Sequence, residues 1–106
     1  MDESGYDVQL TSMAERDLFR LLDWLEDNVS LAFADKFEAR FNALLEGLGR
    51  WPQQWQSVEV AGRPVRRAVI QKSWIVFYEV KPDQQRVIVM GIRGAREDWT
   101  NTPLPI

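Results

Sequence analysis

The sequence predicts an α+β fold of order β-α-α-β-β-β, in which a helical hairpin packs on one face of a small, mainly antiparallel sheet. Two observations predict this class. Apolar residues recur at helical spacing in the first half of the chain, and runs rich in β-branched and aromatic residues follow in the second half. The 106 residues are enough for one domain and too few for two. Residues 1–106 are therefore expected to form a single domain.

A strand and a helix are expected at the start of the chain. Residues 5–11 alternate apolar and polar side chains, which is the period of a strand with one buried face. Residues 12–28 carry leucines at helical spacing. Ser12 and Glu15 have the spacing of a capping box, in which each side chain satisfies an end amide of the helix. The first helix is thus predicted to open at Ser12.

A second helix is predicted over residues 30–48, where phenylalanines and leucines form one apolar stripe. Either Asn28 or Ser30 can cap its N-terminus. Three residues are expected to end it: Gly47, Gly49 and Pro52. Because the connection between the two helices is so short, we expect them to lie antiparallel as an αα-hairpin.

Three strands are predicted in the second half, over residues 63–71, 74–81 and 86–93, before a tail at residues 94–106. The two later strands are nearly continuous apolar runs, which is typical of central strands covered on both faces. Short turns join the three strands, so they are expected to form an antiparallel meander. The N-terminal strand must join the same sheet.

The irregular connection predicted between the second helix and this meander contains Trp51 and Trp55. Two indole rings in a loop are costly to expose, so both are expected to cover the edge of the core. The functional alternative is a stacking platform for a base or for a side chain of a partner. We favour the structural interpretation.

Composition excludes several classes of function. No apolar run approaches the roughly 18 residues that a membrane span requires, and the N-terminus lacks the order of a secretory signal, so a cytoplasmic location is the default expectation. The chain has no Cys and no His, which removes thiolate chemistry, the commonest general base and the commonest zinc ligand. The sequence has no metal-ligand cluster and no glycine loop that would cradle a phosphate, so no metal and no cofactor are predicted.

The net charge of −3 is unevenly distributed along the chain. Residues 1–49 hold four basic and eleven acidic side chains, whereas residues 50–96 hold nine basic and three acidic ones. This asymmetry indicates one face that meets an anion, unless the two halves neutralise each other in the fold.

Four arginines are candidates for binding a target or an anion: Arg66, Arg67, Arg93 and Arg96. Guanidinium groups offer planar, bidentate donors for phosphate or carboxylate. Since Arg66 and Arg67 are adjacent in a strand, they must point to opposite faces. We expect the guanidinium groups of the meander to gather in one shallow hollow, on the sheet face opposite the helices. The alternative is that each is a solvated charge at a sheet edge.

Glu79 interrupts an apolar strand. It is either a buried acid paired with one of these arginines or an outward residue of a half-exposed strand. The second interpretation is favoured.

Taken in order, four segments carry a resemblance to a known family: Tyr6-Asp-Val-Gln-Leu-Thr-Ser-Met-Ala-Glu-Arg-Asp-Leu, Val65-Arg-Arg, Trp74-Ile-Val-Phe-Tyr-Glu-Val and Val87-Ile-Val-Met-Gly-Ile-Arg-Gly-Ala-Arg. Together with the phenylalanine-spaced second helix, they resemble the RelE/ParE toxin superfamily over about residues 6–98. The resemblance implies a toxin held inactive by a co-expressed antitoxin, whose extended or helical segment wraps the toxin surface.

The superfamily has two main activities. RelE-like members cut messenger RNA in the ribosomal decoding site, and ParE-like members poison DNA gyrase. RNA cleavage needs groups that activate the ribose 2′-hydroxyl, stabilise the phosphorane and protonate the leaving oxygen. Here Arg66 and Arg96 match basic positions of RelE-like nucleases, but Ile75 stands where their usual arginine falls, and the tyrosine or histidine expected near the C-terminus is absent. An acidic chain also fits a ribosome-binding enzyme poorly.

With these departures, the resemblance implies a ParE-like toxin of a type II toxin-antitoxin system, neutralised by a protein antitoxin and acting on a protein target such as DNA gyrase. The first alternative is a RelE-like endoribonuclease, metal-independent and acting on ribosome-bound messenger RNA, with four candidate catalytic residues: Arg66, Arg67, Glu79 and Arg96. The second alternative is a non-toxic binding module on the same scaffold. Whether the chain is an enzyme stays open. No membrane partner is expected, and both a homodimer and a heterotetramer with the antitoxin are compatible with the resemblance.

Overall fold

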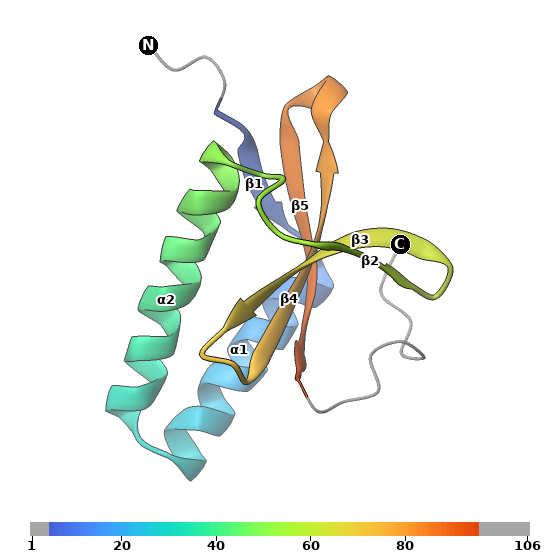
Figure 1. Cartoon of the computed structure of the whole chain (residues 1–106). Coiled ribbons are helices and arrows are strands. Elements are labelled where there is room, and N and C mark those ends of the chain that lie inside the picture. The colour runs from blue at the N-terminus through green and yellow to red at the C-terminus, as the bar shows by residue number, and fades with distance from the viewer. Residues whose placement is uncertain (1–4, 96–106) are drawn as a thin grey trace.

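The computed structural model describes residues 5–95, in which two helices pack on a five-stranded open sheet (Figure 1). The elements, in chain order, are β1 (Asp7–Leu10), α1 (Ser12–Asn28), α2 (Leu31–Arg50), β2 (Ser57–Val60), β3 (Arg63–Ile70), β4 (Trp74–Lys81), a 3₁₀ turn (Pro82–Gln84) and β5 (Arg86–Gly94). The predicted α+β class and helical hairpin are confirmed. Among the described helices, neither combines the length and the apolar character that a bilayer crossing demands.

The sheet has the strand order β1-β5-β4-β3-β2. The N-terminal strand joins it at one edge, where β1 runs parallel to β5. The other neighbours are antiparallel, so β3, β4 and β5 form the predicted meander. The β2–β3 hairpin projects away from the helices at the other edge (Figure 1).

The sequence prediction misses β2. Residues 50–62 were expected to be irregular throughout, but Ser57–Val60 pairs antiparallel with the start of β3. The turn between them consists of Ala61 and Gly62, with φ of 53° and 78°. Positive φ at both central residues is what a tight hairpin turn requires, and Asn or Gly usually supplies it. An alanine at the first position conceals this turn in the sequence.

The helix caps differ in part from the expectation. The residue that caps α1 is Thr11 rather than Ser12, because the Thr11 hydroxyl accepts a hydrogen bond from the Ala14 amide at 3.0 Å. At α2, the Ser30 hydroxyl accepts from the Phe33 amide at 3.0 Å, so Ser30 is the cap. Both hydroxyls satisfy amides that a helix leaves unpaired in its first turn.

The second helix runs past both of its glycines and ends at Arg50. Gly49 allows a close approach there, because an added Cβ would lie only 3.1 Å from the carbonyl oxygen of Tyr6. The Tyr6 amide also donates to the carbonyl of Gly49 at 2.8 Å, which ties the entry of β1 to the end of α2. The prediction that Gly47 and Gly49 end the helix is therefore wrong.

Buried side chains form two clusters, one on each face of the sheet. The larger cluster lies between the helices and the sheet and includes Phe37, Phe41 and Tyr78. The smaller one lies on the opposite face; its members are Val60, Val65, Ile75, Phe77 and Met90. The face opposite the helices therefore carries apolar residues at its centre rather than the hollow of cations expected from the sequence.

Candidate functional site

The structure does not bring the predicted arginines together. In β3, Arg66 pairs with a residue of the helix-side cluster and Arg67 with a residue of the opposite cluster, so they occupy opposite faces as predicted. Arg93, near the end of β5, reaches the first helix, where it binds Asp17. Arg96 lies outside the described residues. Within residues 5–95, the expected gathering of guanidinium groups in one hollow opposite the helices is not found.

Arg66 holds the loop that precedes β2. Its guanidinium donates to the carbonyl oxygens of Trp55 and Gln53, the latter at 3.3 Å. Beside it, the hydroxyl of Tyr78 donates to the carbonyl of Pro52 at 2.7 Å. Burial raises the pKa of Tyr78 to about 12, although the charge of Arg66 lowers it. The phenol therefore stays neutral near pH 7, and both side chains act as ties for the loop.

Glu79 is a partly buried, paired acid, so the favoured outward interpretation is wrong. Its side chain is 13% exposed, and it accepts a hydrogen bond from Nε of Arg63 at 2.7 Å. The ammonium of Lys81 lies 3.5 Å from its other oxygen. The partner is thus Arg63, which the sequence analysis did not select. Both oxygens of Glu79 are thus engaged by cations of the domain itself.

Arg93 and Asp17 form an ion pair between β5 and α1. The two charged groups are 2.8 Å apart, and each side chain is 12% exposed. Asp17 also accepts from the amide of Ile92 at 3.0 Å. Because the carboxylate already neutralises Arg93, an anionic ligand would have to displace Asp17 to use this guanidinium. Asp17 was missed because it reads as one of many acidic residues on the polar side of a helix.

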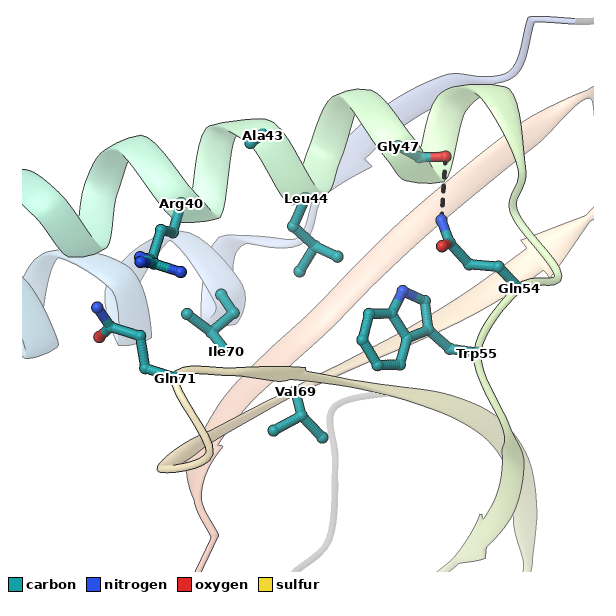
Figure 2. Close-up of a pocket in the computed structure, with 9 residues that line it drawn as sticks. All are labelled: Arg40, Ala43, Leu44, Gly47, Gln54, Trp55, Val69, Ile70 and Gln71. Atoms are coloured by element: carbon teal, nitrogen blue, oxygen red, sulfur yellow. Dashed lines mark hydrogen bonds between the residues drawn. The ribbon is translucent and has the colours of Figure 1, made fainter.

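A groove of about 350 Å³ lies between α2 and β3 (Figure 2). Its walls are formed by Leu44 and Ile70, which point toward each other from the helix and the strand. Arg40 and Gln71 stand at one end and Trp55 at the other. A concave, mostly apolar surface with a few polar groups at its ends is the usual form of a binding site.

Two residues that line this groove each hold a buried polar atom without a hydrogen-bond partner among the described residues: Nε1 of Trp55 and Oε1 of Gln71. Buried polar atoms are paired in the great majority of native structures, so each exception needs an explanation. Arg40 has no ion pair within residues 5–95. The groove therefore offers the exposed cation of Arg40 to a ligand, whereas the two buried atoms are covered by the protein itself. Neither Arg40 nor Gln71 carries a signal in the sequence, since both read as ordinary surface residues.

The two tryptophans of the loop have different environments. Trp55 packs against the helix-side core, which confirms the structural expectation for this residue. Trp51 is 64% exposed, so the expectation that it covers the core is wrong. Trp51 directly follows the last residue of α2, Arg50.

The fold is shared with chains of solved toxin-antitoxin structures. Two solved structures are similar to this chain: a ParDE toxin-antitoxin system of Pseudomonas aeruginosa, at 18% identity and a TM-score of 0.70, and the toxin-antitoxin complex RelBE2 of Mycobacterium tuberculosis, at 18% identity and a TM-score of 0.63. The matches cover 87% of this chain and 98% of the first, and 88% of this chain and 94% of the second. At such identities the likeness establishes the fold.

The particular family follows from the sequence. The family of ParE toxins of type II toxin-antitoxin systems, parDE, matches residues 8–99, so the chain belongs to this family. The predicted superfamily is confirmed. Comparison with curated proteins finds no match.

Proposed function

We propose that this toxin acts on a protein target in the cytoplasm, with DNA gyrase as the expected target, and that a protein antitoxin neutralises it. The observation that carries the proposal is that the side chains a nuclease would need already bind partners within the domain. Arg66 is held by backbone carbonyls, and Glu79 is neutralised by Arg63. Both side chains border a hollow of about 330 Å³, but each is already engaged by a partner within the domain.

The residue at the position where RelE-like nucleases usually have an arginine also supports a protein target over RNA cleavage. Here Ile75 occupies it, is 1% exposed and belongs to the apolar cluster opposite the helices. An apolar side chain at this position cannot stabilise the charge of a phosphorane.

A supercoiling assay tests the target. The purified toxin is added to gyrase and relaxed plasmid DNA, with and without the antitoxin encoded by the neighbouring reading frame. We expect loss of supercoiling or a trapped cleavage complex, relieved by the antitoxin. Normal supercoiling at excess toxin would exclude gyrase as the target.

Two outcomes in cells separate the alternatives. Mapping of messenger RNA ends after induction would show codon-spaced cuts if the chain were a ribosome-dependent nuclease. Unimpaired growth of cells that express the chain without antitoxin would point to the non-toxic binding module.

Sedimentation of the toxin alone and with antitoxin distinguishes a homodimer from a heterotetramer.

A further inference from the structure

We infer that a hollow at the end of α2 is the docking point for the target protein, and that it takes a segment of the target in which an acidic residue stands next to an aromatic residue or a proline. The inference rests on the proposed protein target and names the surface of the toxin that meets it. An exposed indole ring, an ordered loop and an unpaired cation carry it.

The hollow lies where the end of α2, the loop after it and the entry of β1 meet (Figure 1). Its volume is about 470 Å³, and six residues line it: Tyr6, Arg50, Trp51, Pro52, Gln53 and Gln54. The Trp51 side of this surface is prominent, since 64% of the residue is exposed. Trp, Tyr and Arg are the residue types that most often carry the binding energy of a protein interface. The hollow holds one of each.

The loop that carries Trp51 is held in place by hydrogen bonds. Both backbone groups of Trp51 are paired, the amide at 2.8 Å and the carbonyl at 3.2 Å. The carbonyls of the next two residues are bound by Tyr78 and Arg66. A surface that is already ordered in the free protein loses less conformational entropy when a partner binds. The domain therefore presents an exposed ring on an ordered backbone, which suits a binding surface formed in advance.

Arg50 defines the chemistry of the ligand. It is the one charged side chain among the six lining residues, and it forms no ion pair within residues 5–95. A guanidinium binds a carboxylate through two parallel hydrogen bonds. The neighbouring indole offers an apolar face on which an aromatic ring or a proline can pack. An Asp or Glu next to such a residue fits both groups at once.

The charge of the hollow argues against two other occupants. A nucleic acid strand binds through several phosphate contacts, whereas this hollow offers one cation in a chain of net charge −3. A second copy of the chain, related by a two-fold axis through the hollow, would bring two Arg50 side chains together, and like charges repel.

The order of the loop favours the target over the antitoxin. The antitoxin expected from the resemblance wraps the toxin, so it spreads its contacts along a path that orders on binding. A folded target meets the toxin on a limited surface, where a few ordered side chains carry most of the binding energy.

The first test compares Trp51→Ala with the wild type in binding to purified gyrase, in inhibition of supercoiling and in growth arrest of cells without antitoxin. We expect at least about tenfold weaker binding and inhibition, and growth of the cells, while affinity for the antitoxin of the neighbouring reading frame changes less than about twofold. Trp24→Ala is the matched control, because this residue is also exposed, at 52%, but lies on α1 outside the hollow. It should act as the wild type does. Both variants should unfold at the urea concentration of the wild type, which excludes misfolding as the cause.

The second test addresses the cation. Arg50→Gln should weaken binding to gyrase by about fivefold or more and make it less sensitive to salt. Arg16→Gln removes an exposed arginine from α1, outside the hollow, and should change neither quantity.

The outcomes separate this inference from the proposed function. A Trp51→Ala variant that inhibits gyrase and arrests growth as the wild type does would overturn the inference and leave the proposed target intact. Loss of antitoxin affinity with unchanged action on gyrase would assign the hollow to the antitoxin, and loss of self-association with unchanged action would assign it to a second copy; each result overturns the inference.

Growth decides the matter if gyrase is not the target. When the wild type arrests growth without affecting gyrase, relief of the arrest by Trp51→Ala still supports the hollow as the docking point, and persistence of the arrest overturns it. A wild type that neither affects gyrase nor arrests growth would overturn both the proposed function and the inference.

Discussion

Replacement of Tyr78 by phenylalanine tests how the loop before β2 is held. Tyr78 is fully buried, and its hydroxyl donates to the carbonyl of Pro52 at 2.7 Å. The variant keeps the ring and leaves that carbonyl without its donor, so we expect a loss of about 1–2 kcal/mol in the free energy of unfolding at pH 8. Urea unfolding followed by tryptophan fluorescence measures this difference.

The same variant has a distinctive pH dependence. Burial raises the pKa of Tyr78 from 10.0 to about 12, so the unfolded chain loses this proton at a lower pH than the folded protein does. The contribution of the neutral phenol is therefore complete below pH 10 and is lost as the pH rises toward 12. At 1.36 kcal/mol for each pH unit, the loss amounts to about 3 kcal/mol.

Phenylalanine has no such titration, so the two proteins should converge in alkali. We expect the stability advantage of the wild type at pH 8 to shrink above pH 10 and to vanish or reverse near pH 12. Other lysine and tyrosine groups titrate in both proteins and cancel in the difference. A gap that stays constant between pH 8 and pH 11.5 would refute the assignment of a buried, neutral phenol.

Three further predictions concern stability, each measured by urea unfolding. Asp17→Ala should lower the free energy of unfolding by about 3 kcal/mol, because it leaves Arg93 as an unpaired and nearly buried charge. A double-mutant cycle of the two positions should give a coupling energy above about 1 kcal/mol. Gly47→Ala should stabilise the helix by about 0.5–1 kcal/mol, whereas Gly49→Ala should gain less or destabilise, since its Cβ would press on backbone at 3.1 Å; equal gains would contradict the close approach. Ser30→Ala should cost about 1 kcal/mol through the lost N-cap, and no change would show that the cap is not formed.

Much of the fold could be predicted because it depends on periodic patterns. The helical stripes and the apolar runs of β4 and β5 place the core without tertiary information. The strand β2 was missed although Ser57–Val60 alternates polar and apolar residues, because four residues are a short signal and the turn begins with Ala61 rather than Asn or Gly. The run of α2 through its glycines was also hidden, because Gly49 serves a contact with β1 that only the folded chain reveals.

The candidate site was predicted less well, because it depends on which residues meet. Strand alternation correctly placed Arg66 and Arg67 on opposite faces. The partner of Arg93 on α1 and the partner of Glu79 on β3 are pairs distant in sequence, and no local pattern indicates them. The groove beside Trp55 forms where a helix passes an uncovered strand end, which is a property of packing and not of residue type.

The parallel pairing of β1 with β5 has a consequence for synthesis of the toxin. Asp7 lies beside Arg86, so the first strand finds its partner only when the last strand of the sheet has left the ribosome. Such a distant pairing closes a long loop and is slow to form. A nascent or truncated chain that ends before β5 lacks both the neighbour of β1 and the strand on which α1 rests. The chain should therefore complete its fold, and gain any activity that depends on it, only after translation is nearly finished.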